Sequence, residues 1–149
     1  MRKVPARLRP EFYLAADEPS LSRTLPCDVR SVAVARRLVI AALDRWELPQ
    51  DLVDRAELVV SELATNAVVH ARTRGGSIRV GVSRVEDDGV QVAVTDLDRR
   101  PLVRREAGPC AEGGRGLDLV AALSDRWGCE RRHWGKRVWA DLRTAESQR

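Results

Sequence analysis

The stretch of sequence that decides the fold runs Ser61-Glu62-Leu63-Ala64-Thr65-Asn66-Ala67-Val68-Val69-His70-Ala71. It places a carboxylate and a carboxamide one helical turn apart in an otherwise apolar segment. Side chains at positions i and i+4 of a helix lie one above the other, so Glu62 and Asn66 share a face. Their oxygens suit a hard cation such as Mg²⁺ that is completed by waters and substrate phosphates. Taken alone, the pair is also compatible with a solvated glutamate and an asparagine that caps a neighbouring group.

Length and composition limit the class of protein. The chain has 149 residues, of which 44% are hydrophobic and 32% charged, as in a single soluble globular domain. We find no stretch as apolar as a membrane span and no signal-peptide core, so we expect a cytoplasmic protein without a membrane partner. Three cysteines, Cys27, Cys110 and Cys129, have neither disulfide-framework nor zinc-site spacing, which favours reduced thiols.

The charge pattern adds little about partners. A formal net charge of +4 would permit nucleic-acid binding, but the arginines are scattered and no nucleic-acid-reading motif is present, so direct binding is not expected. The basic residues near the N-terminus favour a flexible arm over residues 1–20. Residues 21–145 are then the folded domain.

Apolar periodicity predicts most of the elements. Spacings of three and four indicate helices over 29–46, with Asp28 as a candidate N-cap, and over 51–71, the latter covered on most of its circumference. Strict alternation predicts strands over 78–82 and 90–96, joined at the turn Asp87-Asp88-Gly89. One or two short strands are expected within 12–25.

The C-terminal third is predicted to contain a short helix near 117–123 and two strands over 126–132 and 137–142. Between these elements and the hairpin, residues 98–114 show no periodicity, which is typical of a functional or mobile loop. The four tryptophans are interpreted as core or packing residues. This order of elements favours the α+β class and a two-layer α/β sandwich.

Two further segments carry candidate site residues. Asp96 ends a strand whose alternate residues are valines, where its carboxylate could accept a hydrogen bond from an exocyclic amine or simply form the strand-end turn. Gly113-Gly114-Arg115-Gly116-Leu117 stands directly before a helix, where free backbone N–H groups and the positive helix end attract phosphate. Glycine-rich helix entries are common, so this second signal is weak by itself.

In order, these segments resemble the four nucleotide-binding boxes of the Bergerat-fold ATPases, the histidine-kinase-like ATPase fold. The boxes are residues 61–71, Val94-Thr95-Asp96, Gly114-Arg115-Gly116-Leu117 and Gly135-Lys136-Arg137-Val138-Trp139. Within that superfamily the chain is most similar to the small anti-sigma-factor serine/threonine kinases and their stand-alone actinobacterial relatives. The resemblance covers roughly Leu25 to Leu142.

The resemblance implies roles for individual residues. Asn66 would hold the Mg²⁺ that bridges the phosphates of ATP, Glu62 would be the general base, and Asp96 would accept from the adenine amine. The phosphate side and the lid that closes over it would involve Gly114, Arg115, Gly116, Leu117, Arg104 and Arg105. The two lid arginines are equally compatible with solvated charges.

The resemblance also implies partners, namely a sigma factor, a STAS-type anti-sigma-factor antagonist and a homodimer formed through the sheet or the first helix. Two hypotheses remain open. One is a serine/threonine kinase, favoured by Glu62. The other is an ATP-binding partner-switching module with little or no kinase activity, favoured by Lys136 and Arg137 where the family often has threonine. A sensor histidine kinase is disfavoured because the chain has no room for a phosphoacceptor helix pair.

Overall fold

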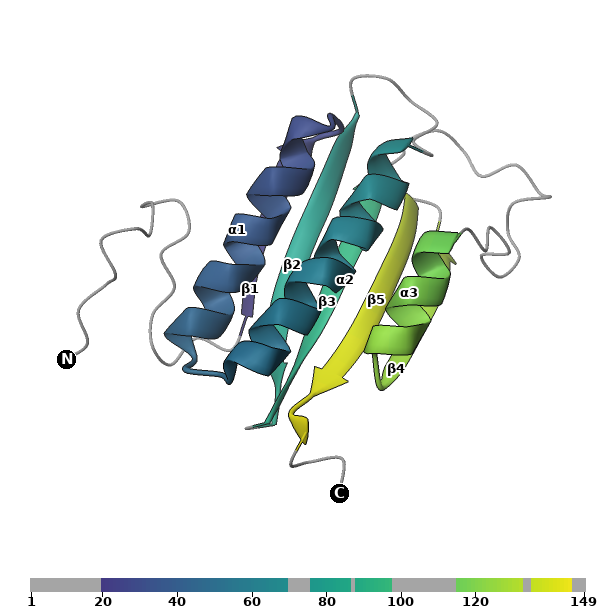
Figure 1. The fold of residues 1–149 in the computed structure, drawn as a ribbon. Coiled ribbons are helices and arrows are strands. Elements are labelled where there is room, and N and C mark those ends of the chain that lie inside the picture. The colour runs from purple at the N-terminus through teal and green to yellow at the C-terminus, as the bar shows by residue number, and fades with distance from the viewer. Residues whose placement is uncertain (1–19, 70–75, 87, 98–114, 133–134, 146–149) are drawn as a thin grey trace.

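The computed structural model describes residues 20–69, 76–86, 88–97, 115–132 and 135–145. Five strands form one antiparallel sheet in the order β1-β2-β3-β5-β4, and the helices lie together on one of its faces (Figure 1). The elements are β1 (Ser20–Pro26), α1 (Arg30–Arg45), α2 (Gln50–Val69), β2 (Ser77–Val85), β3 (Gly89–Leu97), α3 (Arg115–Leu123), β4 (Arg126–Arg132) and β5 (Gly135–Arg143). The predicted two-layer α+β fold is confirmed.

Helix α1 begins after a tight turn at the end of β1. Val29, directly before the first residue of α1, already has helical backbone angles, so the chain enters the helix from Asp28. The carboxylate of Asp28 accepts the backbone N–H of Arg30 at 2.8 Å, as predicted for a capping residue. It therefore satisfies one of the free N–H groups that every helix start leaves open.

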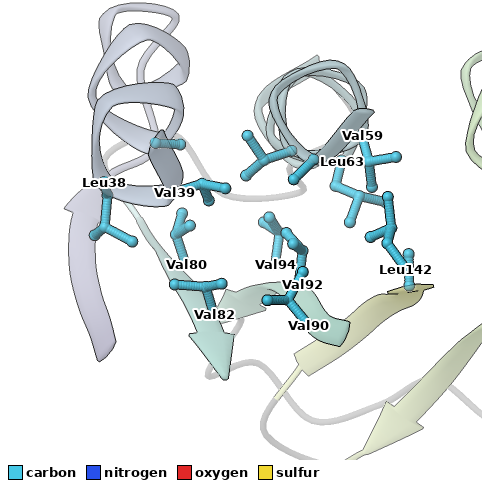
Figure 2. Close-up of a cluster of buried hydrophobic side chains, with 14 of the residues drawn as sticks. Leu38, Val39, Val59, Leu63, Val80, Val82, Val90, Val92, Val94 and Leu142 are labelled. Atoms are coloured by element: carbon cyan, nitrogen blue, oxygen red, sulfur yellow. The ribbon is translucent and has the colours of Figure 1, made fainter. Parts of the chain in front are cut away.

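Helix α2 contributes the centre of the core. Its buried residues Leu52, Ala56, Val59 and Leu63 recur at intervals of three and four, as predicted. They face the alternating valines of β2 and β3, while Leu38 and Val39 of α1 extend the same apolar layer (Figure 2). Removing these side chains from water is the main force that holds the helices on the sheet.

Helix α2 is buried or half-buried over most of its circumference, as predicted, but one narrow outer stripe is exposed. Leu58 is 50% exposed and Val69 is 67% exposed. These side chains lie on the outer surface of the helix layer because no second layer covers it in the described structure. Trp46 is a core residue as predicted, whereas Trp127 is 38% exposed at the edge strand β4.

The strands divide their side chains strictly between two faces. Ile78, Val80 and Val82 of β2 are buried beneath the helices, and the intervening residues Arg79, Gly81 and Ser83 lie on the face that the described helices leave open. The register pairs Val80 with Val94, and Val94 with Val138, so the apolar rows continue across the sheet.

Two smaller findings complete the description. Cys129 of β4 is disulfide-bonded, so the expectation of reduced thiols is wrong there, while Cys27 is a free thiol. Among the described helices, none is at once long and apolar enough to span a bilayer. Strand β1 begins at Ser20, the last residue of the predicted arm.

Candidate functional site

One end of the sheet collects the segments that the sequence marked. Antiparallel pairing places Pro26 of β1 beside Ser77 of β2, Ser77 beside Leu97 of β3, and Leu97 beside Gly135 of β5. Helix α2 ends and helix α3 begins at this same end (Figure 1). Four segments that are far apart in the sequence therefore meet because each strand reverses the direction of the chain.

Glu62 and Asn66 occupy one side of α2 near this end. Both side chains are half-buried, at the margin of the stripe formed by Val59 and Leu63. Arg55 lies about two turns before Glu62 on the same side, and its Nη2 donates a hydrogen bond to the carbonyl oxygen of Arg143 at the end of β5. This side of α2 therefore faces β5 and α3, away from α1.

Asp96 lies on the helix-covered face of β3. It follows Val90, Val92 and Val94 at intervals of two, and those valines are at most 2% exposed beneath the helices. The carboxylate is half-buried near the end of the strand. It thus projects toward the helix layer at the end where Asn66 lies, as an acceptor for a ligand held there requires.

A group that the sequence reasoning missed stands beside Asp96. Cys27 follows β1, and its Sγ lies 4.0 Å from the carbonyl oxygen of Ala67 near the end of α2. Burial raises the pKa of the Cys27 thiol, and the carboxylates of Asp96 and Asp28 raise it further. The signal was available only from the tertiary structure, because Cys27 and Asp96 are neighbours through the β1-β2-β3 pairing alone.

The phosphate side is described in part. Helix α3 begins at Arg115, so Arg115 and Gly116 belong to its first turn, and Leu117 is buried against the core at 4% exposure. Leu117 is therefore an anchor of the helix. The first turn still presents free backbone N–H groups toward the site end. Arg104, Arg105 and Gly114 lie outside the described residues.

The last of the four nucleotide-binding boxes, residues 135–139, has Lys136 and Arg137 where the family often has threonine. The register puts Lys136 of β5 directly opposite Asp96 of β3, and Arg137 opposite Thr95. Side chains alternate along a strand, so Lys136 shares the helix-covered face with Asp96 while Arg137 points to the open face. Of these two cations, Lys136 is therefore the one on the same face as the proposed base-binding carboxylate.

The residues present fit a magnesium-bound nucleotide. Among the described residues no group of three or more histidine, cysteine, aspartate or glutamate side chains could hold a metal. Magnesium that arrives with a nucleotide needs only one or two protein oxygens, because phosphates and waters supply the rest. Asn66 offers such an oxygen, the start of α3 offers donors for phosphate, and Asp96 offers an acceptor for an amine.

Comparison with known proteins agrees with this geometry. The model of the histidine kinase-like ATPase domain matches residues 25–142. The chain belongs to this family. The predicted recognition of an anti-sigma-factor kinase-like ATPase is thereby confirmed at the level of the family and its fold.

Two curated relatives are both named serine-protein kinase RsbW. The protein of Oceanobacillus iheyensis is 28% identical over 115 residues, which is 68% of this chain and 72% of the relative. The protein of Halalkalibacterium halodurans is 28% identical over 119 residues, 72% of this chain and 73% of the relative.

Two solved structures share the fold. The RsbU and RsbW domains of a Mycobacterium tuberculosis protein match with a TM-score of 0.65 and 21% identity over 85% of this chain, which spans 32% of that larger chain. The histidine kinase domain of the blue-light activated histidine kinase of Erythrobacter litoralis matches with a TM-score of 0.54 and 22% identity, over 83% of this chain and 64% of that one.

Proposed function

We propose that this member of the family binds ATP with Mg²⁺ and acts as a serine/threonine kinase that regulates a sigma factor. In this proposal the protein acts in the cytoplasm, where it sequesters the sigma factor and phosphorylates a STAS-type anti-sigma-factor antagonist. The observation that supports the nucleotide part is that α2, which carries Glu62 and Asn66, ends at the same end of the sheet as β3, which carries Asp96 (Figure 1). The names of the two curated relatives support the kinase part.

Each side chain has a distinct task in the proposed reaction. Asn66 would coordinate the Mg²⁺ through its amide oxygen, and the Mg²⁺ would neutralise negative charge on the phosphates. Glu62, four residues earlier on the same side of α2, would accept the proton of the attacking hydroxyl. Asp96 would fix the adenine, and the N–H groups of Arg115 and Gly116 would hold phosphate oxygens. Phosphoryl transfer needs mainly such positioning and charge stabilisation.

A second candidate is an ATP-binding partner-switching module with little or no phosphotransfer. It is favoured by Lys136, which stands opposite Asp96 on the covered face. An ammonium group beside this carboxylate would compete with the adenine amine for the same oxygen atoms. Weak nucleotide affinity would then limit kinase turnover while partner binding continued.

The nucleotide site is tested by thermal unfolding with and without MgATP. At about a hundred times its dissociation constant, a ligand should stabilise the wild-type fold by roughly 2.7 kcal/mol, which is a shift of several degrees. Asn66→Ala should lose that shift. The matched control is Thr65→Ala, because Thr65 is the exposed neighbour on the outer side of α2. An unchanged shift in Asn66→Ala would remove the metal-binding role.

The two candidate functions separate at Glu62. If the chain is a kinase, Glu62→Gln should keep the MgATP-dependent shift and lose transfer of the labelled γ-phosphate to the antagonist protein. If wild-type protein binds MgATP and its partner but transfers no phosphate, the partner-switching module is the correct description. Transfer that persists in Glu62→Gln would show that another group acts as the base.

A further inference from the structure

The open face of the sheet carries a depression that the proposed nucleotide site does not use. It encloses about 170 Å³ over the first three strands, β1, β2 and β3. Its lining includes Ser22, Arg79, Gly81, Ala93, Thr95 and Arg137. We propose that this depression is a docking site for an acidic segment of a partner protein, with a carboxylate side chain held between Arg79 and Arg137.

The floor of the depression is a row of small residues. The register aligns Ser22 of β1, Gly81 of β2 and Ala93 of β3 across neighbouring strands. The row ends at Trp139 of β5, which is opposite Ala93. Three short side chains in register leave the backbone of the sheet uncovered at this point, while the larger side chains of the adjacent rows form the walls.

Gly81 is not required by the backbone or by local packing. A Cβ placed on it would come no closer than 3.7 Å to the Cβ of Ser22, an ordinary contact distance. Gly128 of β4 differs, because a Cβ there would lie 2.7 Å from the indole ring of Trp139, which rests on that glycine. A glycine inside a strand weakens it, so one that nothing in the fold demands indicates a place where another molecule approaches closely.

The walls carry positive charge and a fixed hydrogen-bond network. Arg137 Nη2 donates to Gln91 Oε1 at 2.8 Å, and Gln91 Nε2 donates to Asp141 Oδ1 at 3.0 Å. Asp141 in turn forms an ion pair with Arg126 at 3.1 Å. This series of hydrogen bonds fixes the position of the Arg137 side chain at the rim of the depression. Apart from a long 3.9 Å contact with Glu130, the other N–H donors of the Arg137 guanidinium group remain for a ligand.

The charge of the depression selects its occupant. Arg79 is exposed, and among the described residues no carboxylate pairs with it. The described lining contains two arginines, hydroxyl and amide groups, and no acid. Arginine binds carboxylates through paired N–H donors, so an acidic side chain is the complementary ligand.

The size of the depression argues against a small-molecule ligand. Pockets for drug-sized molecules enclose roughly 300–1,000 Å³, which is well above this volume, so the depression fits a side chain of a larger partner. The test below distinguishes an acidic partner segment from a second copy of this chain.

The test uses amide NMR spectra of the full chain titrated with a peptide of alternating glutamate and serine, and with the same peptide carrying glutamine for glutamate. The glutamate peptide should shift the amides of Gly81, Ala93 and Thr95, and added salt should weaken it. Arg79→Gln should weaken binding by up to about fivefold. Arg37→Gln, an exposed arginine of α1 on the other side of the molecule, is the control of equal charge.

A second variant separates the shape of the depression from charge alone. Gly81→Leu fills the depression without changing a charge, and it should abolish the shifts at Ala93 and Thr95 while the protein remains folded by thermal unfolding. The proposal is overturned if the wild type binds no glutamate peptide, or if Arg37→Gln weakens binding as much as Arg79→Gln. It is also overturned if the chain dimerises and Gly81→Leu makes it monomeric, because the occupant is then a second copy. None of these readouts depends on ATP.

Discussion

The two faces of the same sheet differ in almost every physical property. On the covered face, Val80, Val92 and Val94 are at most 2% exposed beneath the helices and lead to Asp96 at the end of β3. On the open face, the residues one position away are Arg79, Ala93 and Thr95, and they surround a polar depression. The alternation of side chains along a strand is enough to separate the core and the proposed nucleotide site from the proposed docking site.

This contrast shows how few residues a small domain needs for two separate surfaces. Asp96 and Thr95 are consecutive, yet one is placed in the proposed nucleotide site and the other lines the depression. Their neighbours on β5, Lys136 and Arg137, are separated in the same way. Substitutions one residue apart should therefore change different properties of the protein.

The largest expected effect comes from the covered face. Leu63→Ala removes a side chain that is 2% exposed between α2 and the sheet, and it should lower the free energy of unfolding by about 2–5 kcal/mol. Ser83→Ala on the open face should change it by no more than about 0.5 kcal/mol. Urea unfolding measures both. Equal losses would mean that the two faces contribute alike to stability.

Two glycines on the open face provide the next comparison. Gly128→Ala places a methyl group 2.7 Å from the Trp139 ring and should cost about 1–3 kcal/mol, because the indole must move. Gly81→Ala meets only ordinary contacts and should be neutral or stabilise the fold by up to about 1 kcal/mol. Urea denaturation of the two variants provides the measurement. A costly Gly81→Ala would show that the fold itself requires this glycine.

A smaller effect should appear at the site end of the covered face. Asp96→Asn removes a negative charge that raises the pKa of Cys27, although burial is the larger cause. The pKa should fall toward its usual value, so a larger fraction of Cys27 is thiolate at a fixed pH near 8. Alkylation of Cys27 by iodoacetamide, followed by peptide mass spectrometry, should then be faster.

The control for that measurement is Asp54→Asn, an exposed carboxylate in the first half of α2 that should leave the rate unchanged. An identical alkylation rate in Asp96→Asn and wild type would contradict the closeness of the two groups. It would also weaken the proposed position of the adenine.

The smallest effect concerns the start of α1. The backbone N–H and then the side chain of Arg30 hold the pKa of Asp28 below its usual value, although the carboxyl is partly exposed. Its folded-state pKa is therefore below its unfolded one, so its stabilising contribution is present above about pH 4 and is lost as the pH falls through the folded value. The difference in unfolding free energy between wild type and Asp28→Ala should be small at pH 7 and smaller at about pH 3. A difference that grows in acid would contradict this sign.

Local sequence was informative wherever the physics is local. The spacing of Val90, Val92 and Val94 predicted β3, and the spacing of Leu52, Ala56, Val59 and Leu63 predicted the buried stripe of α2. The pair Glu62 and Asn66 is likewise a property of one helix, since residues four apart on a helix are always neighbours. These predictions needed no knowledge of the rest of the chain.

Prediction was poorer where a neighbour comes from elsewhere in the chain. The exposure of Leu58 and Val69 depends on whether another layer covers α2, which periodicity cannot report.

The sequence by itself determined the class of fold, the order of its elements and the membership of a nucleotide-binding family, because hydrophobic period and short motifs are written in consecutive residues. Only the tertiary structure decided that β5 inserts between β3 and β4, that Cys27 stands beside Asp96, and that Gly81 and Ala93 form the floor of a basic depression. Those facts depend on pairing between distant strands, and long-range pairing is fixed by the burial of the whole core.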